Sequence, residues 1–209
     1  MNKTRPLILV VNDDGYEAKG LEAMIEIAKP LGEVAVVVPD RTRSGMGHAI
    51  TMGEPLRLTN YKNEDGIAYY KTNGTPVDCV KLGEKVVLRN RKIDLLLSGI
   101  NHGSNASVSL IYSGTMAAAI EAAFDNIPAV GLSVQDYSPN ADFTASVHFG
   151  RQIVYNNQQP CRRHPGRPDG RRAADLPCGV QADAVDRPRP ADRQPERAAG
   201  CGPGDQGPP

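Results

Sequence analysis

Aromatic residues and long apolar runs are scarce in this chain. It contains no tryptophan and only three phenylalanines among 209 residues. No run approaches the roughly 20 apolar residues that a membrane-spanning helix requires, so we expect no membrane as partner. The apolar run Leu7–Val11 near the N-terminus is short and is followed at once by two acidic residues, which is unlike a secretory signal.

The chain also lacks a net charge, because 24 lysines and arginines balance 24 acidic residues. Nucleic-acid-binding domains usually carry a basic excess, so we expect no nucleic-acid duplex as partner. The four cysteines have irregular spacing that matches neither a zinc pattern nor a disulfide framework; they are Cys79, Cys161, Cys178 and Cys201. These observations favour the reducing cytoplasm as the compartment.

The composition changes near residue 150. Residues 1–150 carry 14 basic and 17 acidic residues, whereas residues 151–209 carry ten arginines, no lysine and seven acidic residues. The second part also holds ten of the 17 prolines. Such a segment cannot bury enough apolar surface to offset its chain entropy. We therefore expect a folded domain over residues 1–157, then a disordered or out-of-frame tail over residues 158–209 without strands.

Short apolar runs, typical of strands buried on both faces, alternate with helical patterns in the first part. The expected strands cover residues 7–11, 34–38, 94–97 and 129–134, and the expected helices residues 21–28, 76–88, 113–125 and 141–156. Residues 49–58 and 67–72 are expected to be extended and to pair, and residues 98–112 to form a long loop. This alternation predicts an α/β fold with a doubly wound, mostly parallel sheet between two layers of helices.

Polar loops follow three of the expected strands, at the edge where such sheets bind ligands. The first contains Asn12-Asp13-Asp14-Gly15, whose adjacent carboxylates suit a hard divalent cation if the chain turns there. An ordinary turn with Asp14 capping the next helix explains the same residues equally well.

The other polar loops have similar pairs of interpretations. Ser44 and Gly45 lie in an arginine- and glycine-rich loop that can hold a phosphate or can be a plain surface loop. Asn101 and Asn105 are either ligands or turn formers. Ser113-Gly114-Thr115 opens a helix, which favours an anion but is also an ordinary helix start. Two histidines beside these loops, His48 and His102, are candidate proton donors or surface residues.

Taken together and in order, these motifs resemble the SurE family of survival-protein-E 5′-nucleotidases over about residues 6–150. The motifs are Leu-Val-Val-Asn12-Asp-Asp-Gly, Arg43-Ser-Gly, Ala49-Ile-Thr, Asn73-Gly-Thr-Pro-Val-Asp-Cys, Ser98-Gly-Ile-Asn-His-Gly-Ser-Asn105 and Tyr112-Ser-Gly-Thr115. The resemblance implies a Rossmann-like three-layer α/β/α fold and a cytoplasmic phosphatase. It implies activity on nucleoside 5′-monophosphates and assembly as a homodimer or tetramer.

The resemblance also implies the site residues. Asp13, Asp14, Ser44 and Asn101 match the family's ligands to one divalent cation, with Mg or Mn expected. Asp13 and Asp14 are the expected catalytic residues, orienting an attacking water or, for Asp13, attacking the phosphorus directly. The expected phosphate contacts are Ser44, Gly45, Asn105, Ser113, Gly114 and Thr115.

The chain departs from the family after about residue 150. Family members continue with further strands and an arm exchanged between subunits, whereas this chain continues with an Arg/Pro/Gly-rich string. We therefore expect the later strands and the arm to be missing and the assembly to be weaker. The alternative to an active 5′-nucleotidase is a nucleotide- or metal-binding module without turnover.

Overall fold

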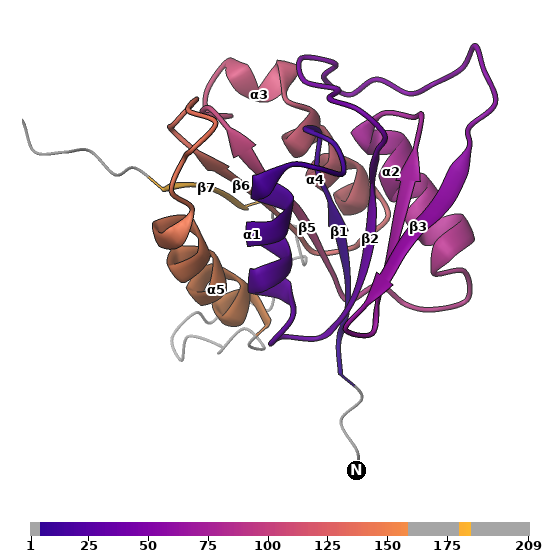
Figure 1. The fold of residues 1–209 in the computed structure, drawn as a ribbon, viewed down its shortest axis with the longest axis horizontal. Coiled ribbons are helices and arrows are strands. Elements are labelled where there is room, and N and C mark those ends of the chain that lie inside the picture. Colours follow the sequence, from indigo (N-terminus) through magenta and orange to yellow (C-terminus); the bar gives the residue numbers. More distant parts are fainter. Residues whose placement is uncertain (1–4, 159–179, 185–209) are drawn as a thin grey trace, which may run out of the picture.

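The computed structural model describes residues 5–158 and 180–184 (Figure 1). The elements, in chain order, are β1 (Leu7–Val11), α1 (Lys19–Ala28), β2 (Glu33–Pro39), β3 (Leu58–Glu64), β4 (Ile67–Thr72), α2 (Pro76–Leu82), the π-helical turn η1 (Gly83–Val87), β5 (Leu95–His102), α3 (Ser109–Tyr112), α4 (Gly114–Phe124), β6 (Ala129–Val134), α5 (Thr144–Gln158) and β7 (Val180–Ala184). No helix in this part of the chain is long and apolar enough to cross a membrane.

The strands form one sheet in the order β3-β4-β2-β1-β5-β6-β7. Only β3 and β4 pair antiparallel, and every other neighbouring pair is parallel. The chain builds the sheet outward from β1 on one side and from β5 on the other, so the order reverses between these two strands. The predicted doubly wound, mostly parallel sheet is confirmed, and the reversal between β1 and β5 is the place where such sheets bind ligands.

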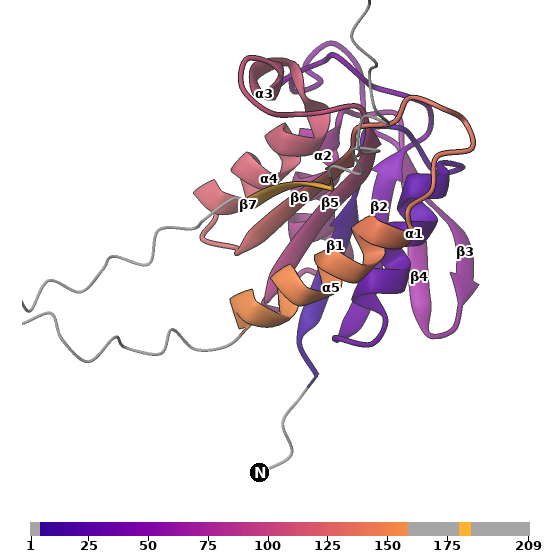
Figure 2. The same cartoon turned by 90° about the vertical axis from the view of Figure 1, so that its left-hand side faces the viewer.

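Helices cover both faces of the sheet, with α1 and α5 on one face and α2 and α4 on the other (Figures 1 and 2). Strand β1 shows why its apolar run is continuous. Ile8 and Val10 pack on the α1 and α5 side, and Leu9 and Val11 pack on the α2 and α4 side. Cys79 is a fully buried free thiol in the hydrophobic core on the α2 and α4 side of the sheet. The other three cysteines lie outside the described residues.

The starts of α2 and α4 lie at the predicted positions, and each is capped by a side chain. Thr75 caps α2, its side chain accepting from the backbone N–H of Asp78 at 3.2 Å, while the Asp78 carboxylate accepts from the backbone N–H of Thr75 at 2.9 Å. Pro76 occupies the first helical position, where its missing N–H costs nothing. Ser113 caps α4 by accepting from the N–H of Met116 at 3.0 Å.

The prediction that residues 49–58 pair with residues 67–72 is wrong, because β4 pairs with Leu58–Glu64 instead. Side chains at the start of α2 instead form hydrogen bonds with backbone groups of residues 49–58. Asp78 accepts from the N–H of Thr51 at 3.1 Å, and the Thr75 hydroxyl donates to the carbonyl of Ala49 at 2.7 Å. A segment bonded in this way to side chains has no free backbone edge to offer a neighbouring strand.

The prediction of one long loop over residues 98–112 is also wrong at both ends. Strand β5 continues to His102, because a register shift after Ser98 lets Asn101 and His102 pair with the end of β6. The turn-forming residue types of this stretch hid the strand. The short helix α3 then occupies Ser109–Tyr112.

Strand β7 corrects the expectation of no strand after about residue 157. It pairs in parallel register with β6, from Val180 beside Val130 to Ala184 beside Val134. A free strand edge offers a row of backbone donors and acceptors, and pairing with it requires no apolar side-chain pattern. The rest of the expected tail, residues 159–179 and 185–209, lies outside the described residues, and the division into a domain and a tail stays a prediction.

Candidate functional site

The loop after β1 turns sharply and carries the two adjacent carboxylates. The Asn12 side chain closes the turn by donating to the carbonyl of Gly15 at 2.8 Å and accepting from its N–H at 3.3 Å. Gly15 has a φ of +97°, which residues with a side chain rarely adopt. Asp13 is buried in this turn and Asp14 is half-buried. The turn that metal binding by both carboxylates requires is therefore present.

Asp13 is held from the opposite side of the site by helix α4. The Thr115 hydroxyl donates to Asp13 Oδ1 at 2.6 Å, and both residues are buried. Burial raises the pKa of Asp13 to about 6, the Thr115 hydrogen bond opposes the rise, and the neighbouring charge of Asp14 adds to it. A bound cation would favour the ionised form of this carboxyl.

Asp14 faces the loop after β2 and the end of β5. The Ser44 hydroxyl donates to Asp14 Oδ1 at 3.3 Å. Burial raises the pKa of Asp14, while the nearby His102 and the Ser44 hydrogen bond lower it in part. The two loops are also joined through the backbone, because the N–H of Arg43 donates to the carbonyl of Asp13 at 2.7 Å. Ser44 is thus fixed beside the carboxylates.

The end of β5 contributes two amides. The Asn101 side-chain nitrogen donates to Asn105 Oδ1 at 3.1 Å and to the carbonyl of Gly103 at 3.2 Å, which leaves the Asn101 amide oxygen to accept. The Asn105 side-chain nitrogen is buried and has no hydrogen-bond partner among the described residues. A buried unpaired donor is costly, so this atom marks a place for an acceptor oxygen of a ligand.

These loops enclose one cavity of about 220 Å³ at the reversal between β1 and β5. The predicted residues that line it are Asp13, Ser44, Gly45, Asn101, Asn105 and Ser113. Three others lie behind the lining. Asp14 contacts Ser44, Thr115 contacts Asp13, and Gly114 is so close to Asp13 that a Cβ there would come within 2.8 Å of the Asp13 Cβ.

Several lining residues were not among the predicted ligands, namely His102, Gly103, Ser104, Ser109, Tyr112 and Tyr137. His102 was considered as a proton donor or a surface residue, not as a ligand. The sequence signal for Tyr137 was its place in the loop after the strand at 129–134, an edge position like that of Asp13. His48 lies elsewhere, with its Nε2 2.7 Å from the carboxylate of Glu121 on α4.

The donor set fits a hard divalent cation. Two carboxylates, a hydroxyl and an amide oxygen are the ligand types that Mg and Mn prefer. No group of three or more His, Cys, Asp or Glu side chains with metal-binding geometry occurs among the described residues. Of the described residues that line the cavity, none is lysine or arginine. A phosphate beside Asp13 would therefore need a cation to offset the carboxylate charge.

Comparison with known proteins agrees with this geometry. The sequence profile of the family described as Survival protein SurE matches residues 8–184, most of the chain. The chain belongs to the SurE family. The resemblance inferred from the motifs is thus confirmed, and the SurE profile extends beyond residue 150 to the end of β7.

Similar SurE proteins come from several bacteria. The 5′-nucleotidase SurE of Cytophaga hutchinsonii is 55% identical over 151 residues, which cover 72% of this chain and 58% of the relative. That of Porphyromonas gingivalis is 42% identical over 178 residues, covering 83% and 70%. The crystal structure of the SurE protein from Aquifex aeolicus matches with a TM-score of 0.66 and 40% identity, covering 75% of this chain and 62% of that one. The chain spans about three fifths of the length of the first curated SurE relatives.

Proposed function

We propose that this chain is a metal-dependent phosphomonoesterase that hydrolyses nucleoside 5′-monophosphates to nucleoside and phosphate, a 5′-nucleotidase among the phosphoric monoester hydrolases. The observation that carries the proposal is a single cavity that brings together the Asp13 carboxylate, the Ser44 hydroxyl and the unpaired amide donor of Asn105. The relatives named 5′-nucleotidase SurE support the same activity.

The proposed ligands of one Mg or Mn ion are Asp13, Asp14, Ser44 and Asn101, which three separate loops bring to the same edge of the sheet. A divalent cation held there supplies positive charge that offsets the charge of the phosphate oxygens during phosphoryl transfer. Thr115 keeps Asp13 in place through its 2.6 Å hydrogen bond and so acts as a positioning residue.

The chain's own donors orient the phosphate. The Asn105 amide nitrogen is free to donate, and Ser44, Gly45 and Ser113 line the cavity around it. The start of α4, capped by Ser113, adds the favourable end of the helix dipole. We assign Gly114 and Thr115 a supporting place behind these contacts.

The chemical step proceeds by attack of a water on phosphorus. A carboxylate of the Asp13–Asp14 pair orients this water and accepts its proton as the new oxygen–phosphorus bond forms. The bond between phosphorus and the 5′ oxygen breaks, and the leaving oxygen takes up the proton that the carboxylate accepted, which gives the nucleoside and leaves the carboxylate ionised again. Direct attack by Asp13 on phosphorus, with water then hydrolysing the aspartyl phosphate, is the alternative route; one of its two carboxylate oxygens, Oδ1, already accepts from Thr115.

A binding module without turnover is the second candidate. It would use the same cavity and the same unpaired Asn105 donor to hold a nucleotide phosphate without breaking its ester bond. Phosphate release from adenosine 5′-monophosphate in the presence of Mn or Mg, stopped by a chelator and restored by excess metal, supports the enzyme. Nucleotide binding without any release supports the module.

The same proposal covers compartment and assembly. We place the protein in the cytoplasm, and we expect a homodimer or tetramer that dissociates more readily than those of the longer relatives. Sedimentation over a dilution series tests the assembly, and a dimer that persists at nanomolar concentration contradicts it.

A further inference from the structure

Two exposed tyrosines stand at the rim of the cavity. Tyr137, in the loop between β6 and α5, is 79% exposed, and Tyr112, at the end of α3, is 62% exposed. Figure 1 shows α3 and the β6–α5 loop at the same end of the molecule. Large aromatic rings that remain exposed beside a ligand cavity are suited to contact a ligand, because their faces gain by being covered.

The cavity is too small for a whole nucleotide. Its volume of about 220 Å³ lies below the roughly 300 Å³ at which pockets for drug-sized molecules begin. The buried polar groups of its lining, Asp13 and Asn105, and the exposed Ser44 hydroxyl beside them suit the phosphate end of the substrate. A base attached to that phosphate through its sugar must therefore project outward, over the rim.

The Tyr137 ring lies directly beside Gly103. A Cβ at Gly103 would come within 2.4 Å of Tyr137 Cε1 and 2.6 Å of Cζ, so any side chain there would displace the ring from this position. Gly103 also has a φ of +90°, which favours a residue without a side chain. Because Gly103 lies between Asn101 and Asn105, the tyrosine ring lies next to the proposed phosphate contacts.

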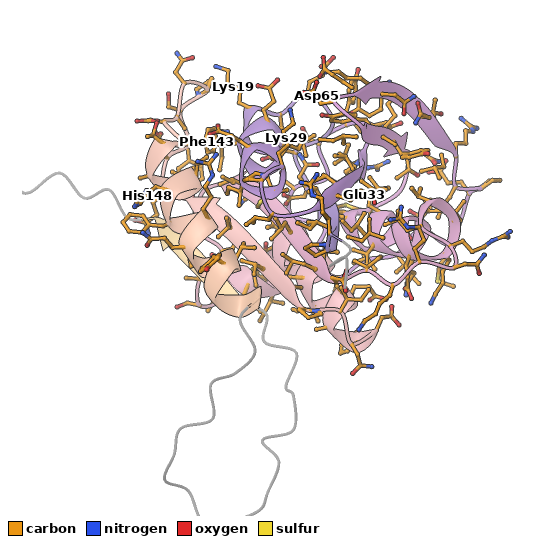
Figure 3. All side chains as sticks on the ribbon, turned by 90° about the horizontal axis from the view of Figure 1, so that it is seen from below. Lys19, Lys29, Glu33, Asp65, Phe143 and His148 are labelled. Carbon is orange, nitrogen blue, oxygen red and sulfur yellow. The ribbon has the colours of Figure 1, made fainter. Side chains whose placement is uncertain are left out.

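The loop that carries Tyr137 is tied down at several points. The backbone carbonyl of Asp136 lies 3.1 Å from His102 Nδ1, and the Asp136 carboxylate accepts from the N–H of Ser138 at 2.7 Å. The Lys19 ammonium on α1 donates to the carbonyl of Pro139 at 3.0 Å, and the Lys19 side chain is seen beside this loop in Figure 3. These bonds restrain the backbone on both sides of Tyr137, so less of the loop has to be ordered when a ligand covers the ring.

We propose that Tyr137 is the platform on which the nucleobase of the substrate stacks. This inference rests on the proposed function and adds to it the residue that distinguishes nucleotides from other phosphate esters. Every base has a face that can stack on an aromatic ring, so the platform accepts all bases and favours the larger purines modestly.

Nucleoside binding tests the platform without metal or turnover. Adenosine is titrated into the full chain and the heat of binding is measured by calorimetry. Tyr137→Ala should bind adenosine about tenfold more weakly than the unchanged protein does, as is usual for the loss of a stacking partner. Tyr137→Phe keeps the ring and should retain the affinity. Tyr155→Ala, which removes another exposed tyrosine on α5, is the matched control and should bind as the unchanged protein does.

Kinetics provide the second measurement. The preference for adenosine 5′-monophosphate over ribose 5-phosphate, as a ratio of kcat/KM values, should fall about tenfold in Tyr137→Ala, mainly through the KM of the nucleotide. If Tyr137→Ala keeps both the substrate preference and the affinity for adenosine, the proposed role of Tyr137 is wrong. It is also wrong if only Tyr112→Ala loses them. If the unchanged protein releases no phosphate but binds adenosine through Tyr137, the proposed activity fails and the platform stands.

Discussion

Asp13 and Asp14 are neighbours in the chain but have different surroundings. Asp13 is buried against Thr115 of α4, whereas Asp14 is half-buried and reaches Ser44 and the end of β5. Burial raises the pKa of both carboxyls. Two carboxylates packed together in partial burial repel each other, and a shared cation is the simplest way to relieve that repulsion.

Ser44 should matter for metal and phosphate together, because its hydroxyl lies 3.3 Å from Asp14 and also lines the cavity. In Ser44→Ala we expect both the KM for the nucleotide and the metal concentration for half-maximal activity to rise, each about tenfold, as for the loss of one hydrogen bond to a charged group. Thr59→Ala, on the exposed face of β3, is the control. If both quantities stay at their original values, Ser44 is only a loop residue.

The sequence alone identified half of the lining residues, because strand ends of a parallel sheet converge on one edge. Asp13, Ser44 and Asn101 were found in this way. The role of Thr115 could not be predicted, because its hydrogen bond joins residues 102 positions apart and depends on how α4 packs beside β1. Tyr137 was not predicted for the same reason, because its ring lies beside Gly103 only in the folded chain.

At the scale of elements, the sequence predicted correctly those features that depend on neighbouring residues alone, such as helix starts. The helix starts at residue 76 and at Ser113 were predicted from residue type and position, and α2 and α4 begin there, capped by Thr75 and Ser113. The predicted pairing of residues 49–58 with residues 67–72 was wrong because side chains distant in the sequence, and not a neighbouring strand, hydrogen-bond to backbone groups of residues 49–58. The Asp65-Gly66 turn, with φ values of 53° and 76°, instead pairs β3 with β4.

Glu121 links three elements and gives a pH-dependent contribution to stability. On α4 it accepts from Lys81 of α2 and lies 2.7 Å from His48. Burial tends to raise the pKa of Glu121, but the hydrogen bonds from Lys81 and His48 outweigh burial, and the pKa is lowered. A carboxyl with a lowered pKa stabilises the fold above its usual pKa of 4.5, and this contribution is lost as the pH falls through the folded-state value.

We therefore expect the free energy of unfolding to fall more steeply below pH 4.5 in the unchanged protein than in Glu121→Gln. The difference should be on the order of 1 kcal/mol, because Lys81 is half exposed and water screens its charge. Denaturant titrations at several pH values measure it, with the exposed Glu54→Gln as control. If the free energy of unfolding depends on pH in the same way in the unchanged protein and in Glu121→Gln, the contacts of Glu121 with Lys81 and His48 do not contribute to stability as proposed.

At the scale of the whole molecule, the site needs strands from both halves of the sheet. Asp13 follows β1, Ser44 follows β2, and Asn101 and Tyr137 come from β5 and the loop after β6. Strand β7 extends the second half by pairing with the outer edge of β6. This pairing makes β7 a support for β6 at the edge of the sheet.

Two truncations measure that support. A chain ending at residue 184 keeps β7, and a chain ending at residue 157 lacks it. Because β7 pairs along the length of β6, we expect the shorter chain to have a thermal midpoint lower by several degrees, about 1 kcal/mol or more of stability. Equal midpoints by circular dichroism would show that β6 does not depend on this pairing.

The most direct test of the account is phosphate release by Asp13→Asn, which keeps the shape of the side chain and removes one negative charge from the proposed metal site. We predict that release from adenosine 5′-monophosphate with Mn present falls about 100-fold or more, or about 2.7 kcal/mol of transition-state stabilisation, with the fold retained by circular dichroism. Glu17→Gln removes the same charge from an exposed position nearby and should stay active. Turnover by Asp13→Asn close to that of the unchanged protein would contradict the assignment of this cavity as the catalytic site.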